Sequence, residues 1–329
     1  MPKHKKGHKA AGTTNKTDKS LVKVVVKPDD AGEWVKPNTL DKFYIDDEAN
    51  FPTIEFEIKT DAPGPYKWSW AMSWDAHVSG LREHARGKKL ATFSDKGDFT
   101  QNEKKWNAKT INKVIGGRLT VTVEVGAEKF RRTVLISAQQ PSPEKIKAYL
   151  IAKNETALEK LLAQESKFKH LIVLDGEPVV AGDSGYGAAQ LTKPKPKYSQ
   201  IWSWKENVDA AIVLIAQKKA AAKKMLDGHG SYTQDMLDTE TISRWNGGNY
   251  YVWNVTPAPG KWERDNNILC DTKTGNMGWD MSVEANKGKT EDELHERDKD
   301  VYKKMKKGQT AEHPWKYTGV CYADHVLGN

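Results

Sequence analysis

Apolar and polar residues alternate with a period of two along much of the first 140 residues. In the segment 53–60, Ile54, Phe56 and Ile58 lie on one face and polar residues lie between them. Such alternation is typical of a strand with one buried and one solvent-facing side. Similar or β-branched runs occupy further segments: 21–27, 66–74, 118–125 and 130–137. The pattern predicts a β-rich first half.

The segment 66–74 places five large side chains on one strand face: Tyr66, Trp68, Trp70, Met72 and Trp74. Flat rings of this kind can stack on sugars, but aromatic residues on one face of a strand usually lie in the core. We therefore predict a core strand. About seven strands separated by turn signals favour an immunoglobulin-like β-sandwich over 21–140. No acid, base or nucleophile pattern occurs in this half, so we expect a positioning or binding module.

The hydrophobic period changes to that of helices after Pro141. Ser142 fits the N-cap of a helix, and Pro143 fits its first position, where a missing N–H costs nothing. A long helix is predicted at 207–226, a charged surface helix at 290–307 and a closing helix at 313–327, with a loop-rich stretch at 254–289. The second half is therefore predicted to be all-α, and the whole chain α+β.

Glu165 lies on the apolar stripe of a predicted helix that Asn154 caps. The apolar members of the stripe are Leu158, Leu161, Leu162 and Phe168. A carboxylate on a core-facing stripe is partly desolvated, which raises its pKa and favours the protonated acid needed to protonate a leaving oxygen. The alternative is that the helix ends here and Glu165 is exposed, and periodicity alone favours that alternative.

The surrounding residues reverse this preference, because three motifs occur in the order of a known superfamily. They are Glu165-Ser166, the turn Gly185-Tyr-Gly-Ala-Ala-Gln190, and the segment 242–250, where Trp245 stands in place of a usual tyrosine. Together they resemble the lysozyme-like soluble lytic transglycosylases and goose-type lysozymes. The resemblance covers about residues 143–329 and implies a catalytic domain over 141–329.

The resemblance implies a role for each matching residue. Glu165 would protonate the glycosidic oxygen between N-acetylmuramic acid and N-acetylglucosamine and then act as base on the 6-hydroxyl of the sugar. Ser166 would orient the acid or its loop, and Asn246 would flank the acid. An indole has a single N–H donor, so Tyr250 or Tyr251 is the candidate for the missing hydroxyl. The implied substrate-binding residues are Ser166, Tyr186, Gly187, Gln190, Trp245, Asn246 and Tyr250.

A second carboxylate would decide whether water takes part. An inverting muramidase needs one about 6.5–9.5 Å from the acid. Asp183 lies close to where goose-type lysozymes carry an acidic residue, whereas Thr192 stands where they carry another. Asp183 is equally suited to the turn Gly182-Asp-Ser-Gly. The favoured interpretation is a transglycosylase that uses Glu165 alone, and a lysozyme using Glu165 and Asp183 is the alternative.

Charge narrows the choice of partners. The chain carries a formal net charge of +8, and six lysines and one acid give residues 1–20 a charge of +5. Residues 21–329 carry a net charge of +3, which argues against a nucleic-acid-binding protein. Residues 1–20 are expected to be a disordered basic tail. An adaptor that binds polyanions through this tail is an alternative, as is a noncatalytic wall-binding or phage-tail protein. The histidines are scattered and fit no metal motif, and no cofactor is expected.

The expected location follows from the substrate. The N-terminus begins with positive residues but has no apolar stretch after them. No apolar run approaches the roughly 20 residues that cross a bilayer. We therefore expect an antibacterial effector that is exported by a contractile injection machine, such as type VI secretion, and acts on peptidoglycan in the periplasm of a target cell. A component of a phage particle is the alternative. A secretion component and an immunity protein are the expected partners. In that oxidising compartment Cys270 and Cys321 are expected to form a disulfide.

Overall fold

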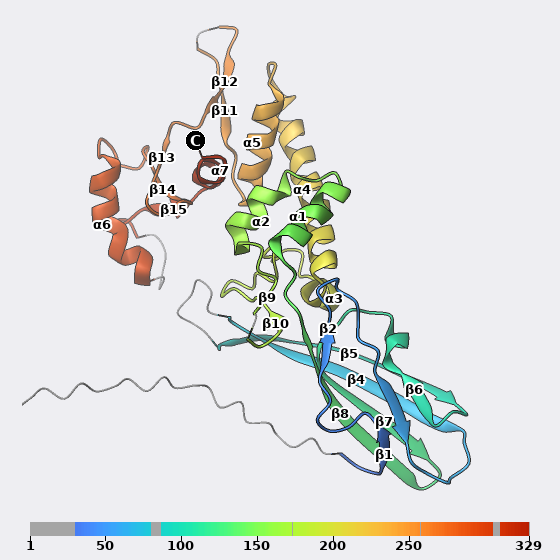
Figure 1. The fold of residues 1–329 in the computed structure, drawn as a ribbon. Coiled ribbons are helices and arrows are strands. Elements are labelled where there is room, and N and C mark those ends of the chain that lie inside the picture. The colour runs from blue at the N-terminus through green and yellow to red at the C-terminus, as the bar shows by residue number, and fades with distance from the viewer. Residues whose placement is uncertain (1–29, 80–86, 173, 257, 305–309, 329) are drawn as a thin grey trace, which may run out of the picture.

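The computed structural model describes residues 30–79, 87–172, 174–256, 258–304 and 310–328. Its larger β-sheets precede residue 140 and its helices mostly follow it, so the predicted α+β class is confirmed at this level (Figure 1). The basic tail 1–20 and the strand predicted at 21–27 lie outside the described residues.

A five-stranded sheet forms most of the first half, in the order β2-β8-β7-β4-β5. Strand β2 runs parallel to β8, and the other neighbours are antiparallel. The strands predicted at 66–74, 118–125 and 130–137 are confirmed, whereas β5 is mainly polar and was not predicted. The bounds are β2 Phe43–Ile45, β4 Tyr66–His77, β5 Lys89–Gln101, β7 Gly117–Val125 and β8 Glu128–Ala138.

A three-stranded sheet packs against the first one across a shared core. Phe56 of this sheet stacks on Trp106 with ring centroids 5.8 Å apart, and Trp106 lies 6.2 Å from Trp68 of β4. The aromatic face of β4 therefore lies inside, as predicted, apart from Trp70, which is half-buried. The strands are β1 Trp34–Lys36, β3 Glu55–Ile58 and β6 Lys105–Asn107.

The first helices of the second half begin and end at identifiable residues. Helix α1 spans Pro143–Ala152, and the Ser142 hydroxyl accepts from the backbone N–H of Lys145 at 3.2 Å, which confirms the predicted N-cap. Helix α2 spans Leu158–Ser166. The predicted cap at Asn154 was wrong, because this residue takes a left-handed conformation with φ of 56° in the preceding turn.

A hairpin of two helices follows α2. After the short strands β9 (Leu171–Ile172) and β10 (Glu177–Pro178), helix α3 spans Tyr198–Trp202. Helices α4 (Trp204–Leu226) and α5 (Gln234–Trp245) then pack side by side (Figure 1). The helix predicted at 207–226 is confirmed, and it begins three residues earlier because the Ser203 hydroxyl caps it at the N–H of Glu206.

The prediction that the second half is all-α was wrong, because the segment predicted to be loop-rich contains short strands that pair with one another. Strands β11 and β12 form a hairpin, and β13, β14 and β15 form a small sheet. The predicted helix at 313–327 was wrong before Gly319, where α7 begins, because 315–317 pairs with β14. The bounds are β11 Tyr251–Asn254, β12 Lys261–Arg264, β13 Ile268–Cys270, β14 Met277–Asp280, β15 Trp315–Tyr317 and α7 Gly319–Leu327.

Helix α6 spans Glu291–Lys304 and has the predicted capping box. The Thr290 N–H donates to the Glu293 carboxylate at 2.8 Å, and the Glu293 N–H donates to the Thr290 hydroxyl at 3.4 Å. Leu294 is fully buried against Trp279 in a third small core, so the helix packs on the sheet of β13 to β15. The predicted end near residue 307 lies outside the described residues.

The segment 171–202 joins the two halves of the chain. Trp202 packs edge-on against Trp74 with ring centroids 5.4 Å apart, and Tyr186 packs against Phe93 at 5.6 Å. Both residues of the second half thus complete the core of the sheets. These two contacts bury four aromatic rings and fix the position of this segment against the β-rich half.

The two cysteines are joined. A disulfide links Cys270 of β13 to Cys321 of α7, with Cα atoms 5.3 Å apart. It connects the small sheet to the closing helix across 51 residues of sequence. Over the residues that the structure describes, none of the helices combines the length and the apolar character that a membrane span requires.

Candidate functional site around Glu165

Glu165 is the penultimate residue of α2 and is half-buried. The chain turns sharply after it, because Lys167 and Phe168 both have left-handed backbone conformations, with φ of 55° and 60°. The sequence pattern allowed either a partly desolvated acid or an exposed residue at the end of the helix. In the structure the helix does end here, but the carboxylate is partly enclosed.

Two side chains from distant segments donate hydrogen bonds to the same carboxylate oxygen of Glu165. The indole N–H of Trp245, the last residue of α5, lies 3.1 Å from Oε1. The hydroxyl of Tyr322, in α7, lies 2.5 Å from it. Three helices thus converge on one carboxylate, and each contributes one of the three side chains.

The hydroxyl that donates to Glu165 is that of Tyr322 in α7, whereas the sequence suggested Tyr250 or Tyr251. The hydroxyl of Tyr250 donates to Asp324 at 2.6 Å. Asp324 also receives the guanidinium of Arg264 at 2.7 Å. Tyr250 is buried, and burial together with the neighbouring Asp324 carboxylate raises the pKa of its hydroxyl. Tyr250 therefore anchors α7, the helix that carries Tyr322.

Ser166 joins the acid-bearing helix to the glycine-rich turn. Its hydroxyl is buried and donates to the backbone carbonyl of Ala188 at 2.7 Å. Since Ser166 follows Glu165 directly, this bond holds the end of α2 against the turn. The structure thus brings the first two sequence motifs into direct contact.

The turn is packed so closely that Gly187 has no room for a side chain. Gly187 has φ of 70°, and a Cβ there would lie 2.7 Å from both the Asn207 amide and the His170 ring. Asn207, fully buried in α4, donates to the carbonyl of Tyr186 at 3.1 Å and accepts from the N–H of Ala189 at 3.0 Å. The Asn207 side chain therefore holds the backbone of the turn on both sides of Gly187.

His170 supports the same turn and, like Asn207, borders Gly187. It is completely buried, and its Nδ1 accepts from the backbone N–H of Ala188 at 3.2 Å. Burial lowers the pKa of His170 to about 4, because the protonated ring would lose its hydration. A neutral ring is also what this acceptor geometry requires, so His170 acts in packing the turn.

Gln190 and Trp245 line the same small cavity, of about 150 Å³. Gln190 has φ of 49°, and its amide donates to the carbonyl of Gly187 at 2.7 Å. Because Trp245 also donates to Glu165, it connects the acid to this cavity. Lys193 and Lys218 add positive charge to the lining, which otherwise includes Ala189, Leu191, Thr192 and Leu214.

The remaining predicted residues are Asp183, Asn246 and Tyr186, and they differ in exposure. Asp183 is exposed, and its carboxylate accepts from the N–H of Gly185 at 3.1 Å, as expected of a turn residue. Asn246 is exposed at the C-cap of α5, directly after Trp245. Tyr186 is only 2% exposed and packs against the β-sheet core, so its ring contributes to packing.

A buried carboxylate near the third motif was not anticipated from the sequence. Glu240 of α5 is fully buried and accepts from Arg244 at 2.7 Å and from the backbone N–H of Tyr250 at 2.8 Å and of Tyr251 at 3.2 Å. Burial raises its pKa, and these donors oppose that effect. The network holds the segment after Trp245 against α5.

Among the residues that the structure describes, histidine, cysteine and carboxylate side chains form no group of three or more that could hold a metal ion.

Comparisons with protein-family models, with curated proteins and with solved structures found no match for this chain. The arrangement around Glu165 therefore has to be judged on its own chemistry.

Proposed function

We propose that this protein cleaves the glycan strands of peptidoglycan, as a lytic transglycosylase with Glu165 as its acid and base. The observation that carries the proposal is the convergence on Glu165. A half-buried carboxylate receives the Trp245 N–H and the Tyr322 hydroxyl, and the next residue, Ser166, is bonded to the glycine-rich turn. An isolated surface carboxylate would not need such a frame.

The geometry suits an acid that becomes a base. Because Oε1 accepts both hydrogen bonds, the proton of the neutral acid is carried on Oε2 and passes from there to the glycosidic oxygen. The two donors then stabilise the carboxylate that remains, since hydrogen bonds to an ionised acceptor are the stronger ones. That carboxylate next removes the proton of the sugar 6-hydroxyl, which attacks the anomeric carbon and closes an anhydro ring.

The contact of Asp183 favours the transglycosylase over an inverting muramidase. Its carboxylate is bonded to the backbone of its own turn through the N–H of Gly185. A short acidic side chain that accepts from the backbone two residues later is typical of a turn residue. We therefore assign Asp183 to the turn and leave both proton transfers to Glu165.

The proposal extends to the fold and the location. We assign the two packed sheets to an immunoglobulin-like sandwich that positions or binds, and the helices that pack around α4 to a lysozyme-like domain. The Cys270–Cys321 disulfide supports a site of action in an oxidising compartment, such as the periplasm of a target cell. Delivery by a type VI machine, and neutralisation by an immunity protein, belong to the same proposal.

The test is the substitution Glu165→Gln, which keeps the size and shape of the side chain and removes its proton chemistry. We expect wall lysis, measured as the fall in turbidity of purified sacculi, to drop by several orders of magnitude because no other group performs either proton transfer. The circular dichroism spectrum and melting temperature should stay close to those of the unchanged protein.

A matched control is available on the same helix. Glu159→Gln makes the same chemical change at a half-buried residue that pairs with Lys147 on the surface. It should retain wall lysis within about twofold, because it removes only a surface ion pair that contributes little to stability. Equal activity of both variants would remove Glu165 from the mechanism.

A further inference from the structure

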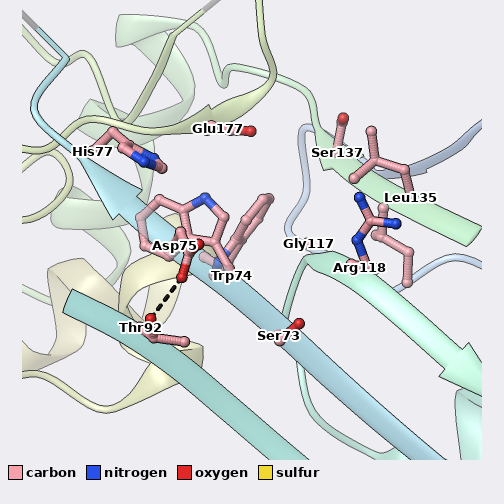
Figure 2. A pocket seen from close by; sticks show the side chains of 12 residues that line it. Ser73, Trp74, Asp75, His77, Thr92, Gly117, Arg118, Leu135, Ser137 and Glu177 are labelled. Carbon is pink, nitrogen blue, oxygen red and sulfur yellow. Dashed lines mark hydrogen bonds between the residues drawn. The ribbon is translucent and has the colours of Figure 1, made fainter. Parts of the chain in front are cut away.

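A second pocket lies where the five-stranded sheet meets β10, and its volume is about 240 Å³ (Figure 2). Sites for drug-sized ligands usually occupy about 300–1,000 Å³, so this one suits a smaller ligand. It lies on the β-rich half, at the junction with the segment 171–202, and shares no lining residue with the cavity beside Trp245.

The pocket is built by the register of the sheet. Ser73, Arg118 and Leu135 are cross-strand neighbours on β4, β7 and β8, so their side chains share one face. Gly117, with φ of 113°, has no side chain to fill the space beside them, and a Cβ there would lie 2.4 Å from the carbonyl oxygen of Ser73. Trp74, Ile136 and Trp202, which also line the pocket, belong to the buried core.

Two opposite charges reach this pocket without an ion-pair partner among the described residues. Arg118 is exposed, and Glu177 of β10 is half-buried. Figure 2 shows Arg118 on one side of Trp74, and Glu177 with His77 toward another. Asp75, by contrast, is already neutralised, because it pairs with Lys89 at 2.8 Å.

We propose that this pocket binds a small ligand with both a free carboxylate and a free ammonium group, that is, an amino acid or a short peptide. The planar guanidinium of Arg118 matches a carboxylate through two parallel hydrogen bonds. The carboxylate of Glu177 accepts from the ammonium, and the Ser73 and Ser137 hydroxyls add further polar contacts. Leu135 and Trp74 provide apolar surface for a side chain. The proposal does not depend on the chemistry of Glu165.

Isothermal titration calorimetry of the full chain tests this directly. The probes are the dipeptide Ala-Ala in its L,L and D,D forms, its N-acetylated derivative and its C-terminal amide. We expect at least one form of the free dipeptide to bind, and each blocked derivative to bind about tenfold more weakly or worse, since each loses a charged hydrogen-bonding group. Absence of binding by both free forms, or equal binding of the blocked ones, would overturn the proposal.

Three variants assign the two ends of the ligand. Arg118→Ala should abolish the preference for a free carboxylate, and Glu177→Gln should abolish the preference for a free ammonium, while each keeps the other preference. Arg131→Ala, at an exposed arginine of β8 that does not line the pocket, should bind as the unchanged protein does. An Arg118→Ala variant that still discriminates against the amide contradicts the assignment.

Discussion

At the residue scale, the structure places a carboxylate between donors that the sequence separates widely. Glu165, Ser166 and Trp245 were recognised as candidates because each belongs to a short motif. Tyr322 was missed because it lies 157 residues after Glu165 and only folding brings the two together. No local pattern marks a tyrosine as a donor to a distant acid, so this part of the site was not predictable.

Tyr322→Phe tests the contribution of that hydroxyl. The change removes one hydrogen bond to Glu165 and keeps the ring, which is buried in the helical core. A hydrogen bond to a charged group contributes about 1.5–3 kcal/mol, so we expect kcat for glycan cleavage to fall about 10–100-fold. Tyr317→Phe, at an exposed tyrosine of β15, should leave kcat unchanged. Equal rates for the two variants would show that the Tyr322 contact is not used in the reaction.

His170 predicts how stability depends on pH. Its pKa is about 4 in the folded chain and near 6.5 when unfolded, so the unfolded chain binds the proton first as pH falls. The free energy of unfolding should therefore decrease between about pH 6.5 and pH 4, by about 3 kcal/mol from this residue. Urea titrations across that range measure the slope.

The matched variant for this prediction is His170→Asn. The asparagine side-chain oxygen can accept from the Ala188 N–H as Nδ1 does, but it does not titrate. The variant should show a shallower pH dependence than the unchanged protein between pH 6.5 and pH 4. Identical slopes would mean that His170 is not the group responsible.

At the element scale, regular patterns were predicted well and mixed ones were not. Strands β3, β4, β7 and β8 follow clear alternation or β-branched runs, and α1 and α4 follow clear helical stripes. The strands between 251 and 280 are only three or four residues long, so their stability comes from pairing and a distant core. Their local sequence is rich in glycine and asparagine, so the composition predicts a loop.

Asn207 illustrates how element packing builds the site. It was visible only as a polar residue at the start of a predicted helix, yet its side chain bonds to both arms of the glycine-rich turn. A polar residue on a buried helix face requires partners. The sequence therefore indicates that Asn207 needs hydrogen-bond partners, but it does not show which segment provides them. In the structure they are backbone groups of the turn that leads to Gln190.

The disulfide holds the element that carries Tyr322. Cys321 is fully buried and directly precedes Tyr322 in α7. Replacing both Cys270 and Cys321 by serine should lower the free energy of unfolding by about 2–4 kcal/mol, because the bond closes a long loop in the unfolded chain. Urea unfolding with and without reductant measures this. Reductant should destabilise only the unchanged protein, and a lack of effect on it would contradict the assignment.

At the scale of the whole molecule, the two halves are structurally continuous. The sequence suggested a boundary near residue 140, where the hydrophobic period changes. The structure packs Trp202 and Tyr186 into the core of the sheets, so the segment that carries the glycine-rich turn is fixed on the β-rich half. Hydrophobic periodicity predicts the local secondary structure, but it does not predict which core a helix or turn packs into.

This continuity gives the β-rich half a role in the proposed reaction. The turn from Gly185 to Gln190 is held by Asn207 and His170 on the helical side and by Phe93 on the sheet side. A glycan strand bound near Gln190 would therefore lie beside a turn that both halves position. We infer that the sheets stabilise the site even though they supply no catalytic residue.

The most direct measurement is mass spectrometry of the soluble fragments released from purified sacculi. We expect muropeptides with anhydro ends from the unchanged protein and none above background from Glu165→Gln. Fragments with reducing ends would contradict the transglycosylase and favour a hydrolase, and an intact, folded protein that releases no fragments from any sacculi would contradict glycan cleavage altogether.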